Sequence, residues 1–111
     1  MSKEYKAFEC AEEVWFWFCR SLNARSDGVR GGKGDFIGYL RDCEICDIER
    51  IIRRLRIEGK ISRRHLRVMI KWGKLDVPPY YDSRAKRSEV RLWDSAMAEF
   101  EKVLYGKGIL K

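Results

Sequence analysis

Apolar residues recur at helical spacing over three long stretches of this chain, and this pattern constrains the fold more than any other feature. Spacings of three and four residues place each set on one face of a helix, whereas a half-buried strand would alternate apolar and polar residues. The sequence therefore predicts an all-α fold of about four helices, with residues 1–111 as a single domain. The three sets are Tyr5, Phe8, Ala11, Val14, Trp15, Phe18 and Leu22; Ile48, Ile51, Ile52 and Leu55; and Val90, Trp93, Ala96, Met97, Phe100, Val103 and Leu104.

The N-terminal segment, residues 1–22, is expected to be an aromatic helix that begins near residue 4, where Ser2 can cap it. Its run Trp15-Phe16-Trp17-Phe18 is apolar on every side, which is more than one face of a lone helix needs. Two interpretations follow, because soluble monomers rarely expose such a patch. Either the helix is clamped inside the domain, or Trp15, Trp17 and Phe18 form a homodimer interface. The last helix is an alternative dimer surface.

Residues 23–35, NARSDGVRGGKGD, contain four glycines and no apolar periodicity, which predicts a glycine-rich loop. Arg25, Arg30 and Lys33 would let this loop touch DNA as a basic arm, although a plain surface loop is the simpler interpretation. The glycine patterns of P-loops and dinucleotide-binding motifs are absent, so no cofactor is expected. Phe36–Leu40 is a short apolar segment of uncertain type.

Polar residues and a glycine mark the ends of two central helices within the core segment 42–74. Asp42 or Asp47 can cap a first helix that runs to about Ile57. Gly59 is expected to end it in the left-handed conformation, where glycine has no steric penalty. Ser62 is a good N-cap for a second helix of about eleven residues.

This second helix is expected to stop at Gly73, and Pro78–Pro79 then predicts a stiff, extended connector. A last helix is expected over residues 83–105, because Gly106 and Gly108 follow its apolar stripe directly.

Positive charge is concentrated in residues 50–74. The chain carries 24 Lys or Arg and 17 Asp or Glu, for a net charge of +7. Ten of these basic residues and only one acid, Glu58, lie between Arg50 and Lys74, which leaves 14 basic and 16 acidic residues elsewhere. Several of the ten stand four apart, where like charges repel on a helix. A polyanion would relieve that repulsion, so the segment predicts binding to nucleic acid.

The basic residues of the second central helix share roughly one third of its surface at about 100° per residue. His65 falls in the opposite, apolar half, which predicts a packed, hydrogen-bonded histidine and not a base reader or metal ligand. Ile70 projects beside the basic face, toward a thymine methyl or a neighbouring helix. The expected DNA contacts are Arg63, Arg64, Arg67 and Lys71 in the major groove, Lys74 on the same face, and Arg53, Arg54, Arg56 and Lys60 on backbone phosphates.

The two central helices match a helix-turn-helix only in part. Ile61, Leu66 and Met69 fit the second half of the motif, but Lys60 is inserted after Gly59, so the turn is expected to be longer than the tight version. Aromatic stacking surfaces and GxxG clamps typical of RNA-binding modules are not visible, which favours double-stranded DNA over RNA. Two alternatives stay open: an adaptor whose basic face binds an acidic protein partner, and an RNA-binding protein.

Catalytic and metal sites are not expected. Cys43 and Cys46 have the spacing of half a zinc site, but no second pair follows, and Cys10 and Cys19 face different ways on a helix. The only histidine, His65, is directed inward, so nothing brings it to a thiol as a nucleophile–base pair. The sequence predicts a DNA-binding protein that is not an enzyme.

The segments DIERIIRRLRIEGKISRRHLRVMIKWG and EVRLWDSAMAEFEKVLYGKGI resemble a group of short uncharacterised bacterial proteins, chiefly alphaproteobacterial, that are basic and carry a helix-turn-helix-like segment. The resemblance implies a bacterial origin and, more distantly, a small DNA-binding regulator of transcription. The longest apolar run, Val14 to Cys19, is far shorter than the roughly 20 residues that cross a bilayer. A cytoplasmic, nucleoid-associated protein is therefore expected.

Overall fold

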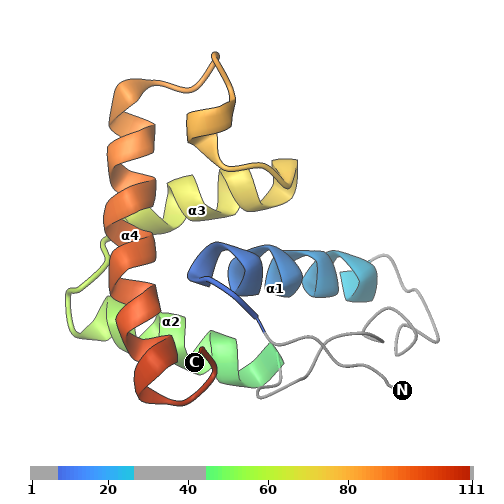
Figure 1. Cartoon of the computed structure of the whole chain (residues 1–111), viewed down its shortest axis with the longest axis vertical. Helices are drawn as coiled ribbons and strands as arrows, with labels where there is room; N and C mark the ends of the chain where they lie inside the picture. The colour runs from blue at the N-terminus through green and yellow to red at the C-terminus, as the bar shows by residue number, and fades with distance from the viewer. Residues whose placement is uncertain (1–7, 27–44, 111) are drawn as a thin grey trace.

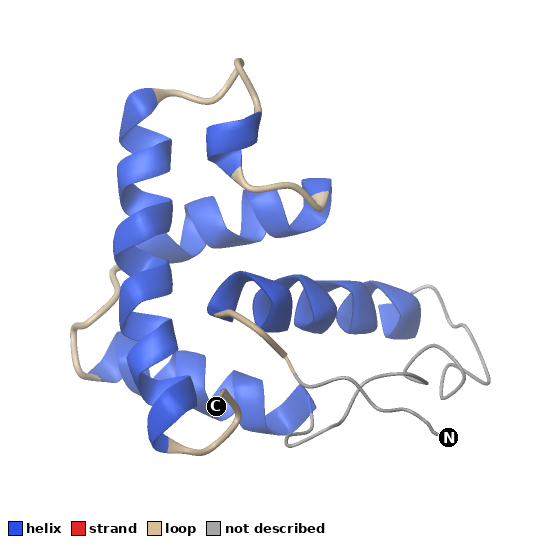
Figure 2. Ribbon diagram, viewed as in Figure 1, coloured by secondary structure: helices blue, strands red, loops and turns tan. Residues whose placement is uncertain are grey.

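The computed structural model describes residues 8–26 and 45–110, and every regular element in these two ranges is helical (Figure 2). The predicted all-α fold is therefore confirmed for the part of the chain described. The elements are α1 (Ala11–Ser26), α2 (Ile45–Ile57), α3 (Arg63–Leu75), the short 3-10 helix η2 (Pro79–Tyr81) and α4 (Arg87–Gly106). Several predictions lie outside the described residues: the Ser2 cap, Tyr5, the basic arm at Arg30 and Lys33, the segment Phe36–Leu40, the Asp42 cap and Cys43.

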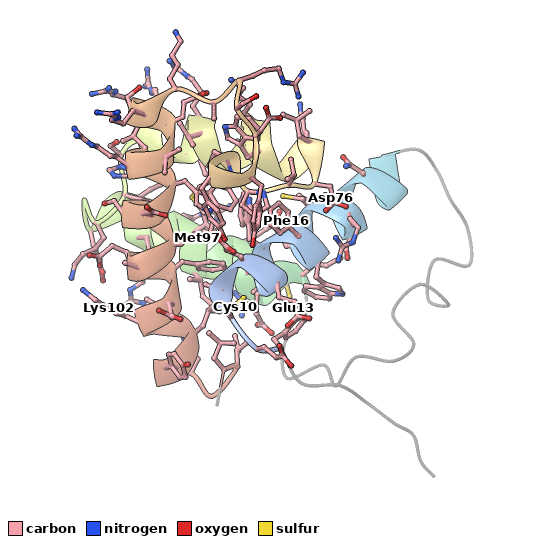
Figure 3. The ribbon with its side chains drawn as sticks, turned by 45° about the horizontal axis from the view of Figure 1, so that its top comes forward. Cys10, Glu13, Phe16, Asp76, Met97 and Lys102 are labelled. Atoms are coloured by element: carbon pink, nitrogen blue, oxygen red, sulfur yellow. The ribbon has the colours of Figure 1, made fainter. Side chains whose placement is uncertain are left out.

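Helix α4 is the element that touches all the others. It packs against α1, α2, α3 and η2, and Figure 1 shows it running across the ends of the other three long helices. Helix α1 packs against both α3 and α2, and α2 and α3 make little direct contact with each other. In Figure 3, Phe16 of α1 and Met97 of α4 lie toward the interior between these helices, whereas Lys102 points away from it.

The apolar stripes predicted from the sequence form the core. Ile48, Ile51 and Leu55 of α2 are at most 2% exposed, and Ile52 is 9% exposed. Trp72 of α3 and Trp93 and Phe100 of α4 are among the largest fully buried side chains. These helices are therefore held by packing of their amphipathic faces, which supplies most of the stability of a short helix in a protein.

Helix α1 differs at both ends from the predicted helix over residues 4–22. It begins at Ala11 and continues to Ser26, so Arg25 belongs to its last turn and not to a loop. A polar contact explains the start, because the Glu13 carboxylate accepts a hydrogen bond from the backbone N–H of Glu9 at 2.6 Å. Glu12 and Glu13 also place negative charge in the first turn, which favours a helix N-terminus there.

The aromatic run of α1 is interior. Trp15, Trp17 and Phe18 are 2%, 3% and 5% exposed within the single chain. Trp15 packs edge-on against Phe100 of α4, and the Phe16 ring stacks on Trp93. This burial supports the interpretation that the helix is clamped inside the domain. It gives no support to a homodimer interface through Trp15, Trp17 and Phe18.

Two predicted caps of the central helices, at Gly59 and Ser62, are confirmed. Gly59 has φ +76°, and the N–H groups of Lys60 and Ile61 close the end of α2 on the carbonyl of Leu55 at 2.9 and 3.3 Å. The Ser62 hydroxyl accepts from the backbone N–H of His65 at the start of α3. Asp47, in contrast, lies inside the first turn of α2 and is not its N-cap.

Gly73 does not end α3, contrary to the prediction. The helix continues to Leu75 and is closed by Asp76, which adopts the left-handed conformation at φ 62° and donates its N–H to the carbonyl of Trp72 at 2.9 Å. Gly73 is buried where α3 crosses α1, and a Cβ there would lie 2.5 Å from the Sγ of Cys19. The glycine is required for this close approach.

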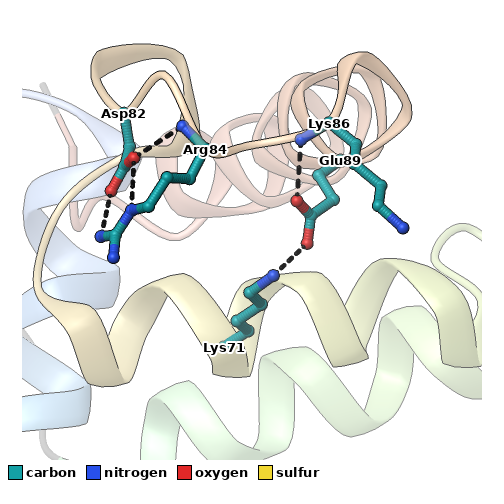
Figure 4. A network of polar contacts seen from close by, with 5 residues as sticks. All are labelled: Lys71, Asp82, Arg84, Lys86 and Glu89. Atoms are coloured by element: carbon teal, nitrogen blue, oxygen red, sulfur yellow. Dashed lines mark hydrogen bonds and ion pairs between the residues drawn. The ribbon is translucent and has the colours of Figure 1, made fainter.

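The connector and the start of α4 also differ from the sequence prediction. Pro78 is extended, with φ −68° and ψ 147°, but the next three residues form η2. Helix α4 begins at Arg87, four residues later than expected, because Asp82 folds the preceding chain by accepting from the N–H and guanidinium of Arg84 (Figure 4). Within the described ranges, no helix is long and apolar enough to span a bilayer.

Candidate nucleic-acid interface

Seven cationic side chains on α2, the following turn and α3 have no acidic partner among the described residues, and we call this set the basic surface. Six of them are exposed and Arg56 is half-buried. Because a cation without an acidic neighbour keeps its attraction for an anion, this surface can attract an anionic partner. Its members are Arg53, Arg56, Lys60, Arg63, Arg64, Arg67 and Lys74. Lys86, Arg87 and Arg91 at the start of α4 are also exposed and have no acidic partner among the described residues.

The arginines of α2 divide between two faces. Arg50 and Arg54 lie beside Val103 and Lys107 at the C-terminal end of α4. Arg50 pairs with Asp47 at 3.4 Å and Arg54 with Glu58 at 3.1 Å, so both charges are partly neutralised. Arg53 and Arg56 lie on the other side of α2, toward α3. Arg54 was predicted to contact phosphate together with Arg53 and Arg56, but it lies on a different face of α2 from them and is paired with Glu58.

The turn between α2 and α3 comprises five residues, 58–62. It is longer than the three or four residues of a tight helix-turn-helix, as the inserted Lys60 predicted. Ile61, which is 1% exposed, fixes the turn to the core, whereas Lys60 is exposed. Since α2 and α3 also make little direct contact, the pair lacks the compact packing of the tight motif.

Helix α3 carries its cations on the outer face, as the helical wheel predicted. Arg63, Arg64, Arg67 and Lys74 are exposed, and Ile70, 43% exposed, lies among them. Spacings of four, three and four residues put Arg63, Arg67, Ile70 and Lys74 in one row along the helix. This row is free of acidic side chains.

Lys71 is the exception on α3. Its ammonium lies 2.6 Å from the Oε2 of Glu89 on α4 and 5.1 Å from the centre of the Trp72 ring (Figure 4). The pKa of Glu89 is lowered, first by the hydrogen bond from Lys71 and then by the backbone N–H of Lys86. Lys71 therefore joins α3 to α4, and its charge is less open to a partner than the sequence predicted.

His65 is hydrogen-bonded, as expected, and acts in the cap of α3. Its Nδ1 accepts from the backbone N–H of Ser62 at 2.9 Å, and its Nε2 lies 3.3 Å from the hydroxyl of Ser95. With Nδ1 as an acceptor, the neutral ring carries its proton on Nε2 and donates to Ser95. The ring is only half-buried, because it lies at the edge between α3 and α4.

A carboxylate at the start of α1 forms a polar contact that no sequence motif indicates. Glu12 accepts from the Tyr80 hydroxyl at 2.7 Å and from the indole N–H of Trp93 at 2.7 Å. The pKa of Tyr80 is raised above its usual range by partial burial and then by this hydrogen bond. Glu12 thus joins α1, η2 and α4, which are separated by up to 81 positions in the sequence.

An apolar groove of about 450 Å³ lies between α2 and α3, with α1 at its floor. No periodicity in one helix could reveal it, because three elements form it together. Two members of the basic surface on α2, Arg53 and Arg56, border it opposite Lys74 of α3. Its lining residues are Trp15, Phe18, Cys19, Leu22, Asn23, Glu49, Ile52, Arg53, Arg56, Leu66, Ile70 and Lys74.

No disulfide joins the three thiols of the described residues, Cys10, Cys19 and Cys46. Cys10 and Cys46 are exposed, and burial raises the pKa of Cys19 to about 12, with a further rise from nearby Asp76. Across residues 8–26 and 45–110, no three His, Cys, Asp or Glu side chains are grouped closely enough to hold a metal ion. Comparison of the chain with protein-family models, with curated proteins and with solved structures found no match.

Proposed function

We propose that this protein binds double-stranded DNA through the basic surface and acts as a transcriptional regulator. One observation carries the proposal: seven cations stand on adjoining elements without acidic partners in the described chain, while Arg50, Arg54 and Lys71 are paired. Phosphate contacts from Lys and Arg supply most of the affinity of a protein for DNA.

The row of exposed side chains on α3 suggests how the protein would dock on DNA. An α-helix fits the DNA major groove, and its N-terminal residues usually reach the base edges. Arg63, Arg64 and Arg67 occupy the first turns of α3, and arginine can bind guanine through two hydrogen bonds. Ile70 follows in the same row, where it can contact a thymine methyl group.

The flanking cations suit contacts with the phosphate backbone. Arg53 and Arg56 on α2 and Lys60 in the turn lie before α3 in the chain, and Lys74 lies near its C-terminal end. Contacts on both sides of a helix fix its register on the duplex. Arg54 and Lys71 are left out of this assignment because each is held by an acidic residue. If the protein binds chromosomal DNA, it acts in the cytoplasm, where the bacterial chromosome lies. Regulation of transcription is then the role that we propose for it.

Fluorescence anisotropy with a labelled duplex tests the proposal. The double variant Arg63→Glu/Arg67→Glu is expected to bind at least about tenfold more weakly, a loss of roughly 1.4 kcal/mol or more. The double variant Lys102→Glu/Lys107→Glu, in the last turns of α4 and at its C-cap, changes the net charge equally away from the basic surface and is the control. Unchanged helicity by circular dichroism ensures that both variants are folded.

Two results would contradict the proposal. Equal loss in both double variants would mean that binding responds only to net charge. Equally tight binding of poly-glutamate of matched charge would instead favour an adaptor that takes an acidic protein. Single-stranded DNA and double-stranded RNA are included as further labelled ligands, and tighter binding to either one would overturn the choice of duplex DNA.

A further inference from the structure

The groove between α2 and α3 combines an apolar interior with a cationic border. Trp15, Phe18 and Leu22 of α1 form its floor, and Ile52 and Leu66 lie on its two sides. Its volume of about 450 Å³ falls in the range of small-molecule sites, which are commonly about 300–1,000 Å³ and mostly apolar. The neighbouring ion pairs of α2, at Arg50 and Arg54, lie on the opposite side of that helix.

The charges at the border are complementary to an anion. Arg53 and Arg56 border the groove from α2 and Lys74 from α3, and among the described residues Glu49 is the one acid that lines it. None of the three cations has an acidic partner among the described residues. Arg56 is half-buried and lines the groove, so its aliphatic part can cover apolar surface while its guanidinium remains available to an anion. A bound anion would therefore find donors on both sides of the opening.

We propose that this groove binds a small amphiphile with an apolar body and one anionic head group, such as a medium-chain carboxylate. The body would lie against Leu22, Leu66 and Ile70, above the nearly buried Trp15 and Phe18, and the head group would contact Arg53, Arg56 and Lys74. A short ligand is favoured over a docked helix. A docked helix inserts apolar side chains from several successive turns and needs a long groove or a row of pockets, whereas here the described residues form one groove between α2 and α3. This proposal does not depend on DNA binding, since the shape of the groove and the charges at its border are features of the protein alone.

Binding of 1-anilinonaphthalene-8-sulfonate to the full chain, without nucleic acid, tests the site. N-phenyl-1-naphthylamine has the same aromatic body without the sulfonate and is the matched uncharged probe. The sulfonate is expected to bind at a stoichiometry of one, about tenfold more tightly than the uncharged probe, because hydrogen bonds to charged groups are strong. Dodecanoate is expected to displace it, and dodecanol is not.

Two pairs of variants locate the binding. Arg56→Ala is expected to weaken binding of the sulfonate about tenfold and to leave the uncharged probe unchanged, whereas Arg54→Ala on the other face of α2 changes neither. Ile70→Glu is expected to weaken binding of both probes, while Ile57→Glu, at a residue 77% exposed and outside the groove, has no effect. Thermal unfolding of each variant verifies that it is folded.

Three results would overturn the proposal. Equal affinities of the two probes would show a surface without preference for anions. Equal effects of Arg56→Ala and Arg54→Ala, or full binding by Ile70→Glu, would place the probe elsewhere. Concentration-dependent self-association in sedimentation, abolished by Ile70→Glu, would identify the groove as an interface between two copies of this chain.

Discussion

The indole N–H of Trp15 donates a hydrogen bond to the backbone carbonyl of Met69 at 2.9 Å, and this buried contact joins α1 to α3. It forms where Gly73 leaves space on α3. A Cβ at that position would lie 2.9 Å from the Trp15 Nε1 and 2.5 Å from the Cys19 Sγ. The α1–α3 contact, on which both the groove and the basic face of α3 rest, therefore depends on a missing side chain.

Gly73→Ala is expected to lower the free energy of unfolding by about 1–3 kcal/mol, the usual cost of overpacking a core. Urea denaturation followed by circular dichroism measures this loss. Gly106→Ala is the matched control, because nothing lies within 4 Å of its Cβ position, and little change is expected there.

A double-mutant cycle assigns the clash to Cys19. Cys19→Ala removes the atom nearest to the new Cβ, so Gly73→Ala should cost less in that background than in the wild-type chain. Strictly additive effects of the two substitutions would show that the contact between Cys19 and Gly73 is not the cause.

His65 is expected to stabilise α3 through its side-chain acceptor. His65→Ala removes the acceptor for the Ser62 N–H and should cost about 0.5–2 kcal/mol, as loss of a helix cap does. His65→Gln should lose less, because glutamine at this position of a capping box also accepts from the N-cap N–H. Chemical denaturation of both variants measures the difference. Equal losses would indicate that the ring acts by packing and not by capping.

The fold was predictable wherever its cause is local. The stripe Ile48–Leu55, the cap at Ser62 and the left-handed Gly59 follow from periodicity and backbone preference, and each is present in the structure. Gly73 was not predictable, since a glycine near the end of an apolar pattern suits either a helix end or a close approach. Only the contact with Cys19, a residue 54 positions away, distinguishes the two.

The candidate site was predictable to the same extent. Helical geometry placed Arg63, Arg67 and Lys74 on an exposed face without reference to the rest of the chain. The pairing of Lys71 was hidden, because Glu89 lies 18 residues away and meets it only after α4 has packed on α3. The ion pair of Arg54 with Glu58, four residues later, is the kind of local pair that sequence spacing can indicate.

Acid is expected to weaken the fold partly through Glu89. The pKa of Glu89 is lowered in the folded chain, so its carboxylate stabilises the fold above its ordinary pKa of about 4.3. This contribution is lost as the pH falls through the lowered folded-state value. Glu89→Gln should therefore lose stability at pH 7 but much less at pH 3, as measured by urea denaturation. Glu101→Gln, on the same helix and without a partner among the described residues, is the control. A difference between wild type and Glu89→Gln that does not shrink in acid would contradict this role.

The thiols are expected to react at very different rates with a disulfide reagent at pH 7. The pKa of Cys19 is raised to about 12 by burial, so almost none of it is thiolate, whereas Cys10 and Cys46 are exposed. In a Cys43→Ser variant, two thiols should be labelled quickly and the third only after denaturation. Three fast thiols in the folded Cys43→Ser variant would contradict the partial burial of Cys19 at the α1–α3 contact.

The salt dependence of duplex DNA binding tests the central account most directly. Each phosphate contact releases counterions and contributes about −0.9 to the slope of log K against log salt concentration. The seven cations of the basic surface, which have no acidic partner in residues 8–26 and 45–110, predict a steep negative slope for the wild-type chain. The slope is expected to be reduced by about 0.9 in Arg67→Ala and unchanged in Arg54→Ala, whose charge is held by Glu58. A slope near zero, or an equal reduction in both variants, would contradict DNA binding through the basic surface.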